Sequence, residues 1–320
     1  MDSKSRAGVR AVGSVVEIHR FAVKSMQGES LSEVPVDKSG VPGDRQWALR
    51  DLVKNELTSA KHFPRIMQLS ARTSAESAQR AHITFPNGEQ WASDNPELDG
   101  ALSSFLKHRV SICQLGPQQE KRHFRLRRFR SPAELRRLLG VRRGGPLPDL
   151  SQLSLSMLAT LSIYATPPGS YLDALPLHLV STSSMAALAR SSGVPVTSER
   201  FRPNFVVNTS DEQGDYPERA WRGCRLLLGE AELQVCGETF RCGMPAHHQS
   251  ARLPKAPEIV KTIYGELGSK FGVYARVIRP GKVRMGDRVV LATPAASPLT
   301  VLEDLGSSMK RAVLEAFLSL

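Results

Sequence analysis

Short stretches in which apolar and polar residues alternate recur along most of the chain, and they predict a mostly β protein. Alternation with a period of two places one face of a strand against a core. Turn signals such as Pro86-Asn87-Gly88 separate these stretches. The predicted strands cover residues 15–23, 45–51, 57–59, 67–72, 82–85, 110–115, 178–180, 205–208, 224–228, 231–235, 274–278 and 288–291.

Helical periodicity is confined to a few segments. Thr182 or Ser183 is placed to cap a helix that ends near Ser191. Many short strands with few long helices favour β-barrel architecture over a doubly wound sheet. The other predicted helices cover residues 95–107, 153–164, 257–267 and 301–320.

The net charge of +12 over 320 residues raises the question of an anionic partner. Much of the excess lies in Lys121–Arg143, which holds ten Lys or Arg residues and the single acid Glu134. Phe124 and Phe129 could stack on nucleic-acid bases, but no recognised binding module surrounds the segment. The charge therefore favours anionic small molecules or an acidic protein partner over nucleic acid.

Cysteine content and hydropathy indicate a location and exclude some classes of protein. The four cysteines fit no iron–sulfur spacing, and their small number suggests reduced thiols in the cytoplasm. The polar, basic N-terminus lacks the apolar core of a signal peptide. Since no stretch of about 18 apolar residues occurs, we expect no membrane span.

The pair Arg241-Cys242, after a predicted strand, is the first candidate for chemistry. A thiolate beside a guanidinium suits a nucleophile or a ligand of a metal that prefers sulfur. A lone cysteine is more often a small buried apolar residue, so the pair needs support from other segments.

Three further segments carry groups that suit an oxyanion or a planar heterocycle. Lys24-Ser25 offers an ammonium, a hydroxyl and a backbone N–H. Asp44-Arg45 reads as strand, with the two side chains on opposite faces. Arg202-Pro203-Asn204 offers a guanidinium fork and an amide. Each segment alone is equally compatible with a solvated loop.

Taken in order along the chain, these segments resemble those of the MOSC superfamily with its N-terminal β-barrel partner, and most closely the amidoxime-reducing component group. The resemblance also includes Leu57-Thr58 ahead of Pro64, Trp221 before a strand hairpin, Phe271–Tyr274 and Val283–Val289. It spans residues 15–291 and is weakest through the basic insertion.

The resemblance implies a MOSC β-barrel packed against an N-terminal β-barrel-like domain, an α+β, mostly β fold with peripheral helices. The implied limits are a disordered N-terminus at 1–12, an N-terminal barrel domain at 13–117, a basic insertion at 118–150, a MOSC domain at 151–291, and a linker with an amphipathic helix at 292–320.

The resemblance also implies a molybdopterin-type molybdenum cofactor. Cys242 would be the thiolate ligand of molybdenum, with Arg241 beside it. The implied activity is two-electron reduction of an N-oxygenated or related small-molecule substrate. Because the chain holds no iron–sulfur motif, electrons would come from a separate donor protein. The residues that would hold the cofactor are Lys24, Ser25, Arg45, Ser181, Thr182, Ser183, Arg202, Asn204 and Arg241.

Two departures from the family pattern bear on the substrate. Thr239 stands where family members commonly carry a second cysteine. His247 and His248 follow the candidate ligand in place of the family's residues, and one of them could donate a proton to a leaving oxygen. A packing or surface role for this pair fits the sequence equally well.

Three alternatives stay open at the level of sequence. Cys242 could carry sulfur in transfer or C–S bond chemistry, or the protein could be a cofactor carrier. Cys236, Cys242, His247 and His248 could form a zinc site, although adjacent histidines rarely ligate one tetrahedral ion, so no zinc is expected.

Overall fold

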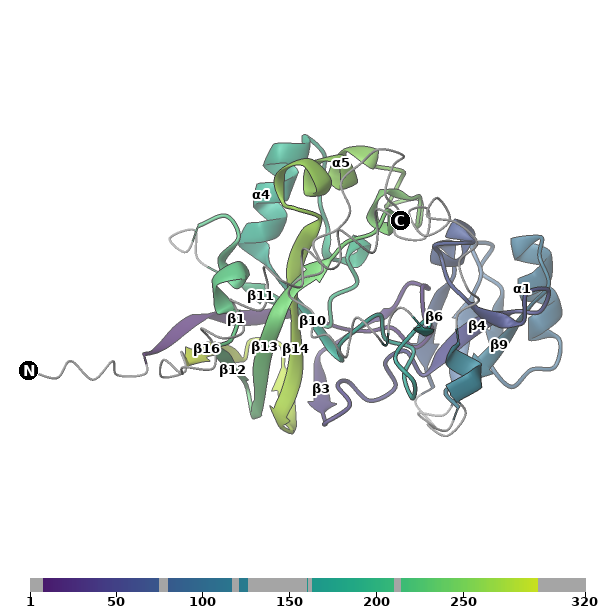
Figure 1. Cartoon of the computed structure of the whole chain (residues 1–320), viewed down its shortest axis with the longest axis horizontal. Coiled ribbons are helices and arrows are strands. Elements are labelled where there is room, and N and C mark those ends of the chain that lie inside the picture. The colour runs from purple at the N-terminus through teal and green to yellow at the C-terminus, as the bar shows by residue number, and fades with distance from the viewer. Residues whose placement is uncertain are drawn as a thin grey trace, which may run out of the picture.

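A computed structural model of the protein describes residues 8–74, 80–116, 121–125, 160, 163–209 and 214–292. Its strands form two bodies, which lie on opposite sides of the view in Figure 1. The larger body contains β1 (Val9–Arg20), β2 (Glu29–Leu31), β10 (Leu177–Ser181), β11 (Phe205–Asn208), β12 (Arg225–Leu228), β13 (Ala231–Phe240), β14 (Lys270–Arg279) and β16 (Arg288–Ala292).

Seven of these strands close into a barrel. The order is β11-β10-β14-β13-β12-β16-β1, and β1 pairs with β11 to complete the ring, while β2 extends the sheet from β1. All neighbours are antiparallel except β10 and β11, which are parallel. The first strand of the chain therefore closes a barrel whose other strands all follow residue 176.

β1 pairs with three neighbouring strands along its length, and its register shifts twice. It pairs with β16, then β11, then β2, and its register shifts between Ala11 and Gly13 and again between Val15 and Glu17. Such bulges bend a strand and increase its twist. Gly13 is required at the first shift, because its φ is +152° and a Cβ there would lie 1.9 Å from the carbonyl oxygen of Asn208.

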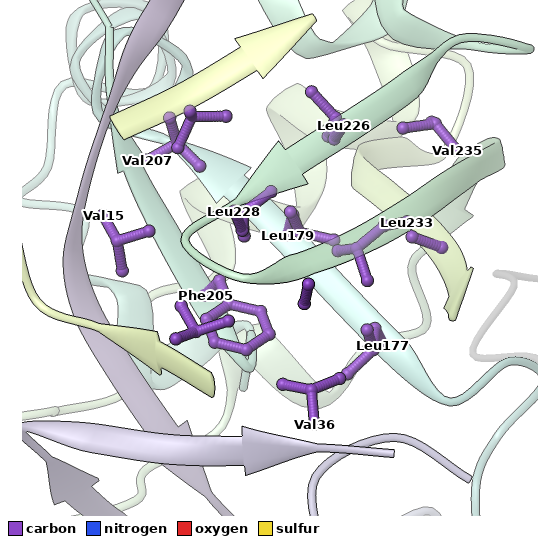
Figure 2. Packing of buried hydrophobic residues seen from close by; sticks show 14 of the residues in the cluster. Val15, Val36, Leu177, Leu179, Phe205, Val207, Leu226, Leu228, Leu233 and Val235 are labelled. Atoms are coloured by element: carbon purple, nitrogen blue, oxygen red, sulfur yellow. The ribbon is translucent and has the colours of Figure 1, made fainter. Parts of the chain in front are cut away.

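The barrel interior is apolar and fully buried. β13 alternates buried and partly exposed positions along its whole length, as a strand with one face in a core must. Each large apolar side chain buried in this way contributes about 1.5–3 kcal/mol relative to an exposed one, so the shared interior is what holds the strands together. Val15, Leu179, Phe205, Leu228 and Leu233 meet there from five different strands (Figure 2).

The smaller body consists of two three-stranded sheets and a helix. Its separate core includes Met26, Leu49, Ile66 and Leu98. The sheets are β5 (Glu56–Thr58), β4 (Trp47–Asp51) and β9 (Val110–Gln114), and β6 (Ser70–Thr73), β7 (Ala81–Thr84) and β8 (Gln90–Ala92); the helix is α1 (Leu98–Leu106).

Further short elements join and cover these bodies. β3 (Glu33–Val36) pairs with β15 (Gly281–Arg284), and their valines extend the barrel core. Helices α4 (Thr182–Ser192) and α5 (Pro257–Glu266) pack on each other at one end of the barrel (Figure 1). No helix within the described ranges is long and apolar enough to cross a membrane. The 3₁₀ turns among the described residues are Pro64–Gln68, Lys121–Phe124, Ser198–Arg200, Pro217–Trp221 and Met244–Ala246.

The predicted fold class, mostly β with peripheral helices and a barrel, is confirmed. Individual limits differ. β1 begins at Val9, so residues 9–12 are strand rather than disordered. The strand predicted at 67–72 is a 3₁₀ turn followed by β6, because Pro64 starts a turn there.

Two more predictions were wrong in detail. The cap of α4 is Ser181, whose Oγ accepts from the backbone N–H of Ser184, rather than Thr182 or Ser183. Asp44 and Arg45 lie in a turn before β4 and pair with each other, not on opposite faces of a strand. Most of the basic segment 121–143, nearly all of the helix predicted at 153–164 and the helix at 301–320 lie outside the described residues.

Candidate functional site

Lys24 lies in the turn that follows β1, and its side chain is only 9% exposed. Its Nζ donates to Asp173 Oδ1 at 2.6 Å and to the carbonyl oxygen of Tyr171 at 2.9 Å. Burial lowers the pKa of Lys24, against the opposing effect of Asp173. The neighbouring Ser25 has φ of +71°, and its Oγ accepts from the backbone N–H of Ala60. A buried ammonium bound by a carboxylate replaces the solvated lysine that a turn would ordinarily carry.

Two arginines stack on one aromatic ring beside this turn. The guanidinium of Arg202 lies 4.3 Å from the centroid of the Phe21 ring, and that of Arg45 lies 5.0 Å from it. Arg45 pairs with Asp44, and its Nη2 donates to the carbonyl oxygen of Arg202 at 3.3 Å. Both arginines have positive φ, +51° and +56°, a backbone conformation that is strained for arginine.

Arg202 has an unused donor. Its Nη2 is buried and has no hydrogen-bond partner among the described residues. Burial, and then the charge of Arg45, lowers the pKa of Arg202 to about 9. A buried guanidinium nitrogen without an acceptor costs free energy, and an acceptor brought by a ligand would recover it.

Arg241 points into the protein rather than toward solvent. Its Nε and Nη2 donate to the carbonyl oxygen of Phe271 at 2.9 and 2.7 Å, and its Nη1 donates to that of Phe201 at 3.1 Å. Its Nη2 also contacts His178 Nε2. Burial, followed by the charge of Arg241, lowers the pKa of His178 well below its ordinary value, so His178 stays neutral and accepts from Arg241.

Cys242 follows directly and is a partly exposed free thiol. The loop after it is held by the buried Arg200, whose Nη1 and Nη2 donate to the carbonyl oxygens of Pro245 and Pro254 at 3.1 and 2.8 Å. On this loop His247 is half-buried and His248 is exposed. Burial lowers the pKa of His247, with a smaller effect of Lys255.

Arg241 is joined to the turn that carries Arg202, since its Nη1 donates to the carbonyl oxygen of the preceding residue, Phe201, and Tyr274 of β14 lies next to His178. Burial raises the pKa of Tyr274, and the charges of Asp173, Arg241, Arg45 and Cys242 also act on it. Its ring centroid is 6.1 Å from that of His178. We use the name cationic cluster for Lys24, Arg45, Arg202 and Arg241 together with the carboxylates of Asp44 and Asp173.

The serines at the start of α4 form a separate, internally satisfied group. Ser181 Oγ donates to Glu218 Oε2 at 2.6 Å, and Ser184 Oγ donates to the same oxygen at 2.6 Å. Ser183 Oγ shares a hydrogen bond with Thr209 Oγ1, and Thr182 Oγ1 accepts from the backbone N–H of Thr209. The acceptor at this helix start is thus the buried carboxyl group of Glu218.

Asn204 is likewise committed to the fold. Its Oδ1 accepts from the backbone N–H of His178 at 3.1 Å, and its Nδ2 donates to the carbonyl oxygen of His19 at 3.4 Å. The amide therefore joins β10 to β1 where the barrel closes, and its predicted role as a cofactor contact stays a prediction.

Sequence reasoning missed Tyr171, Asp173, His178 and Glu218. Tyr171 and Asp173 follow Pro167-Pro168-Gly169, a sequence that predicted only the end of a regular element. His178 was assigned to a short apolar strand, and Glu218 to no element. A search for a carboxylate within reach of Lys24 would have needed the tertiary structure, since Asp173 is 149 positions away.

The alternative zinc set does not assemble. No group of three or more His, Cys, Asp or Glu side chains is placed to hold a metal within the described part of the chain. Cys236 lies on β13, where burial raises the pKa of its thiol.

Comparison with known proteins agrees with this architecture. The sequence profile of the MOSC N-terminal beta barrel domain matches residues 12–113, and that of the MOSC domain matches residues 168–290. The chain is 24% identical over 331 residues to mitochondrial amidoxime-reducing component 1 of Mus musculus, which covers 90% of this chain and 85% of the relative. It is 27% identical over 135 residues to the same component of Homo sapiens, or 38% of each chain.

Solved structures offer more distant similarities. The YUAD protein from Bacillus subtilis aligns over 90% of this chain and 99% of its own, with 13% identity and a TM-score of 0.41. YiiM from Geobacillus stearothermophilus aligns over 37% of this chain and 54% of its own, with 23% identity and a TM-score of 0.29. Such low TM-scores support no inference beyond the two domain matches. Those matches, in the expected order and on a closed seven-stranded barrel, make this chain a member of the MOSC superfamily with an N-terminal MOSC β-barrel domain.

Proposed function

We propose that this protein binds a molybdopterin-type molybdenum cofactor at the cationic cluster and reduces an N-oxygenated or related oxo-substrate. The observation that carries the proposal is an excess of positive charge at side chains that are buried or partly buried. Four cationic side chains face two carboxylates, and the Nη2 of Arg202 lacks an acceptor. A phosphate monoester carries about two negative charges near pH 7 and so matches the excess.

Each residue of the cluster has a role that follows from its position. Lys24, Arg45 and Arg202 would bind the cofactor's phosphate and pterin, with Ser25 held beside Lys24 by its bond to Ala60. Arg241 keeps its neighbour Cys242 in place, since its own donors are anchored on Phe271 and Phe201. Ser181, Thr182, Ser183 and Asn204 support these groups through the fold, because their hydrogen bonds are made within the chain.

Cys242 would supply the protein thiolate to molybdenum, a metal that accepts soft sulfur donors. When bound, the cofactor supplies the two-electron redox chemistry, and the protein supplies binding and electrostatics. Of the two histidines after Cys242, His248 is exposed and His247 is half-buried, so we assign proton donation to His248. The names of the amidoxime-reducing relatives support the choice of an N-oxygenated substrate. Electrons would come from a separate donor protein.

Metal and pterin analysis of the purified protein tests this function. Protein from a molybdenum-replete host is expected to contain molybdenum and to release a fluorescent pterin. Cys242→Ala should lose the metal and the reductase activity, whereas Cys236→Ala, a matched change on the preceding strand, should keep both. A Cys242→Ala protein with full metal content and activity would overturn the proposal. Persulfide sulfur on Cys242 without molybdenum would overturn it in favour of sulfur transfer.

A further inference from the structure

Asp173 differs from the other charged members of the cationic cluster in its exposure. Its side chain is 62% exposed, whereas those of Lys24, Asp44 and Arg45 are 10% exposed or less. Asp44 is held by Arg45 and by the backbone N–H of Phe21, which donates to its Oδ1 at 2.7 Å. Among the described residues, Asp173 has one ion pair, with Lys24. Of the two carboxylates, only Asp173 reaches the cluster from the solvent side.

Asp173 also lies at the electrostatic focus of the cluster. Its negative charge opposes the lowering of the pKa of three cations, Lys24, Arg202 and Arg241. Although partial burial opposes the change, the charges of Lys24 and Lys61 hold the pKa of Asp173 well below its ordinary value. A carboxylate that several cations attract at once occupies the position that a ligand anion would take.

We propose that Asp173 is a displaceable internal counter-ion, which occupies the anion position of the cationic cluster and yields it to the phosphate of the incoming cofactor. This inference rests on the proposed function. It adds a competition between the protein's own carboxylate and the ligand, so that the cluster is neutralised in part before any cofactor binds.

The surrounding contacts allow the side chain to leave without moving the rest of the site. Tyr171 is fully buried, and its hydroxyl donates to the carbonyl oxygen of Gln114 at 2.8 Å. Its own carbonyl oxygen keeps Lys24 in position at 2.9 Å. A change of rotamer at Asp173 would move an already largely hydrated carboxylate into water, which costs little. The Nζ–H group of Lys24 that had donated to Asp173 would then be available to the phosphate. So would the Nη2 of Arg202, which lacks an acceptor among the described residues.

Phosphate binding by full-length, cofactor-free protein tests this inference. The protein would be made in a host unable to synthesise the pterin, and inorganic phosphate would be titrated by calorimetry. Asp173→Asn keeps the size of the side chain and removes its charge. Asp173→Asn should bind phosphate about tenfold more tightly than the wild type. This gain is expected if, in the wild type, the Asp173 side chain has left the anion position in about a tenth of the molecules. Asp173→Glu should bind like the wild type.

The matched control is Asp215→Asn, which removes a carboxylate from an exposed pair with Arg190 and should leave phosphate affinity within about twofold. Unchanged or weaker binding by Asp173→Asn would overturn the inference, as would an equal gain in Asp215→Asn. If Asp173→Asn does not fold, Asp173→Ser is measured in its place. If Asp173→Asn binds phosphate more tightly but wild-type protein from a molybdenum-replete host contains neither molybdenum nor pterin, the counter-ion is supported and the proposed function is overturned. If the replete protein contains the cofactor but Asp173→Asn gains no affinity for phosphate, the counter-ion alone is overturned.

Discussion

The start of α4 and the cationic cluster both attract an anion, and each holds a carboxylate of the chain itself. Glu218 at the helix start is 1% exposed and accepts from two serine hydroxyls. Asp173 at the cluster is mostly exposed, and its one ion pair with a described residue is that with Lys24. A carboxylate that is buried and multiply bonded is part of the fold, whereas one bonded once at the surface can be exchanged for a ligand.

The difference explains why two segments that looked alike in sequence have different roles. Ser181–Ser183 and Lys24-Ser25 both offered hydroxyls and N–H groups for a phosphate. At α4 these donors are already used by Glu218 and Thr209. At the cluster the Nη2 of Arg202 is still without an acceptor among the described residues. Unused donors, rather than donors as such, mark the place where a ligand is expected.

The largest effect should follow from removing Glu218. Glu218→Ala leaves the buried hydroxyls of Ser181 and Ser184 without their acceptor, so we expect a loss of about 3 kcal/mol in the free energy of unfolding. Urea denaturation measures it. Glu218→Gln, which keeps an acceptor and the volume, should cost about 1 kcal/mol. A loss below about 0.5 kcal/mol in Glu218→Ala would mean that this carboxylate is as dispensable as Asp173.

The Glu218 effect should also depend on pH. Burial raises the pKa of Glu218 in the folded protein, so the folded state binds its proton more tightly than the unfolded state does. The resulting stability is present below the unfolded pKa of about 4.3 and is lost as the pH rises through the folded pKa. The glutamine of Glu218→Gln cannot titrate. The free energy of unfolding of this variant, relative to that of the wild type, should therefore increase as the pH rises over that range.

A smaller effect should distinguish the true cap of α4. Ser181→Ala removes both the cap and a hydrogen bond to Glu218, and we expect a loss of about 1.5 kcal/mol in the free energy of unfolding. Thr182→Ala is the matched control and should cost about 0.5 kcal/mol or less. Equal losses in the two variants would contradict the assignment of Ser181 as the cap.

Lys24→Met should change the free energy of unfolding least of these variants. It should change the affinity for phosphate most. Burial lowers the pKa of Lys24 in the folded state, so its charged form costs stability at neutral pH. Removing one partner of an ion pair is costly when the other charge is left buried, but Asp173 is 62% exposed, so we expect a change within about 1 kcal/mol. Phosphate binding measured by calorimetry should be lost. Retained binding would show that the anion position does not depend on Lys24.

Much of the fold was accessible from local pattern. Residues 205–208 were predicted as a strand with the observed limits, and the alternation in 231–235 marks the first half of β13. The pairing of β1 with β11 and β16 was not accessible, because it depends on bulges at Gly13 and near Val15 that no periodicity records. The three-residue β2 and β8 were not predicted.

The candidate site divides in the same way. Lys24, Arg45, Arg202 and Cys242 stand in motifs whose order along the chain could be recognised. The state of each side chain could not. Arg241 was expected to lie beside the metal ligand and to hold the cofactor, and no pattern in the sequence indicated that its donors bind the carbonyl oxygens of Phe201 and Phe271. Such bonds join segments 30 or more positions apart and follow only from the packing of the barrel.

The sequence by itself determined the family, the mostly β fold class and the residues that attract an anion, because these depend on residue type and on short-range period. The tertiary structure decided which of those residues are still available. Closure of the barrel buries Glu218 beneath the start of α4 and brings Asp173 to Lys24. Burial and proximity set the strength of charge interactions, and both arise only when distant segments meet.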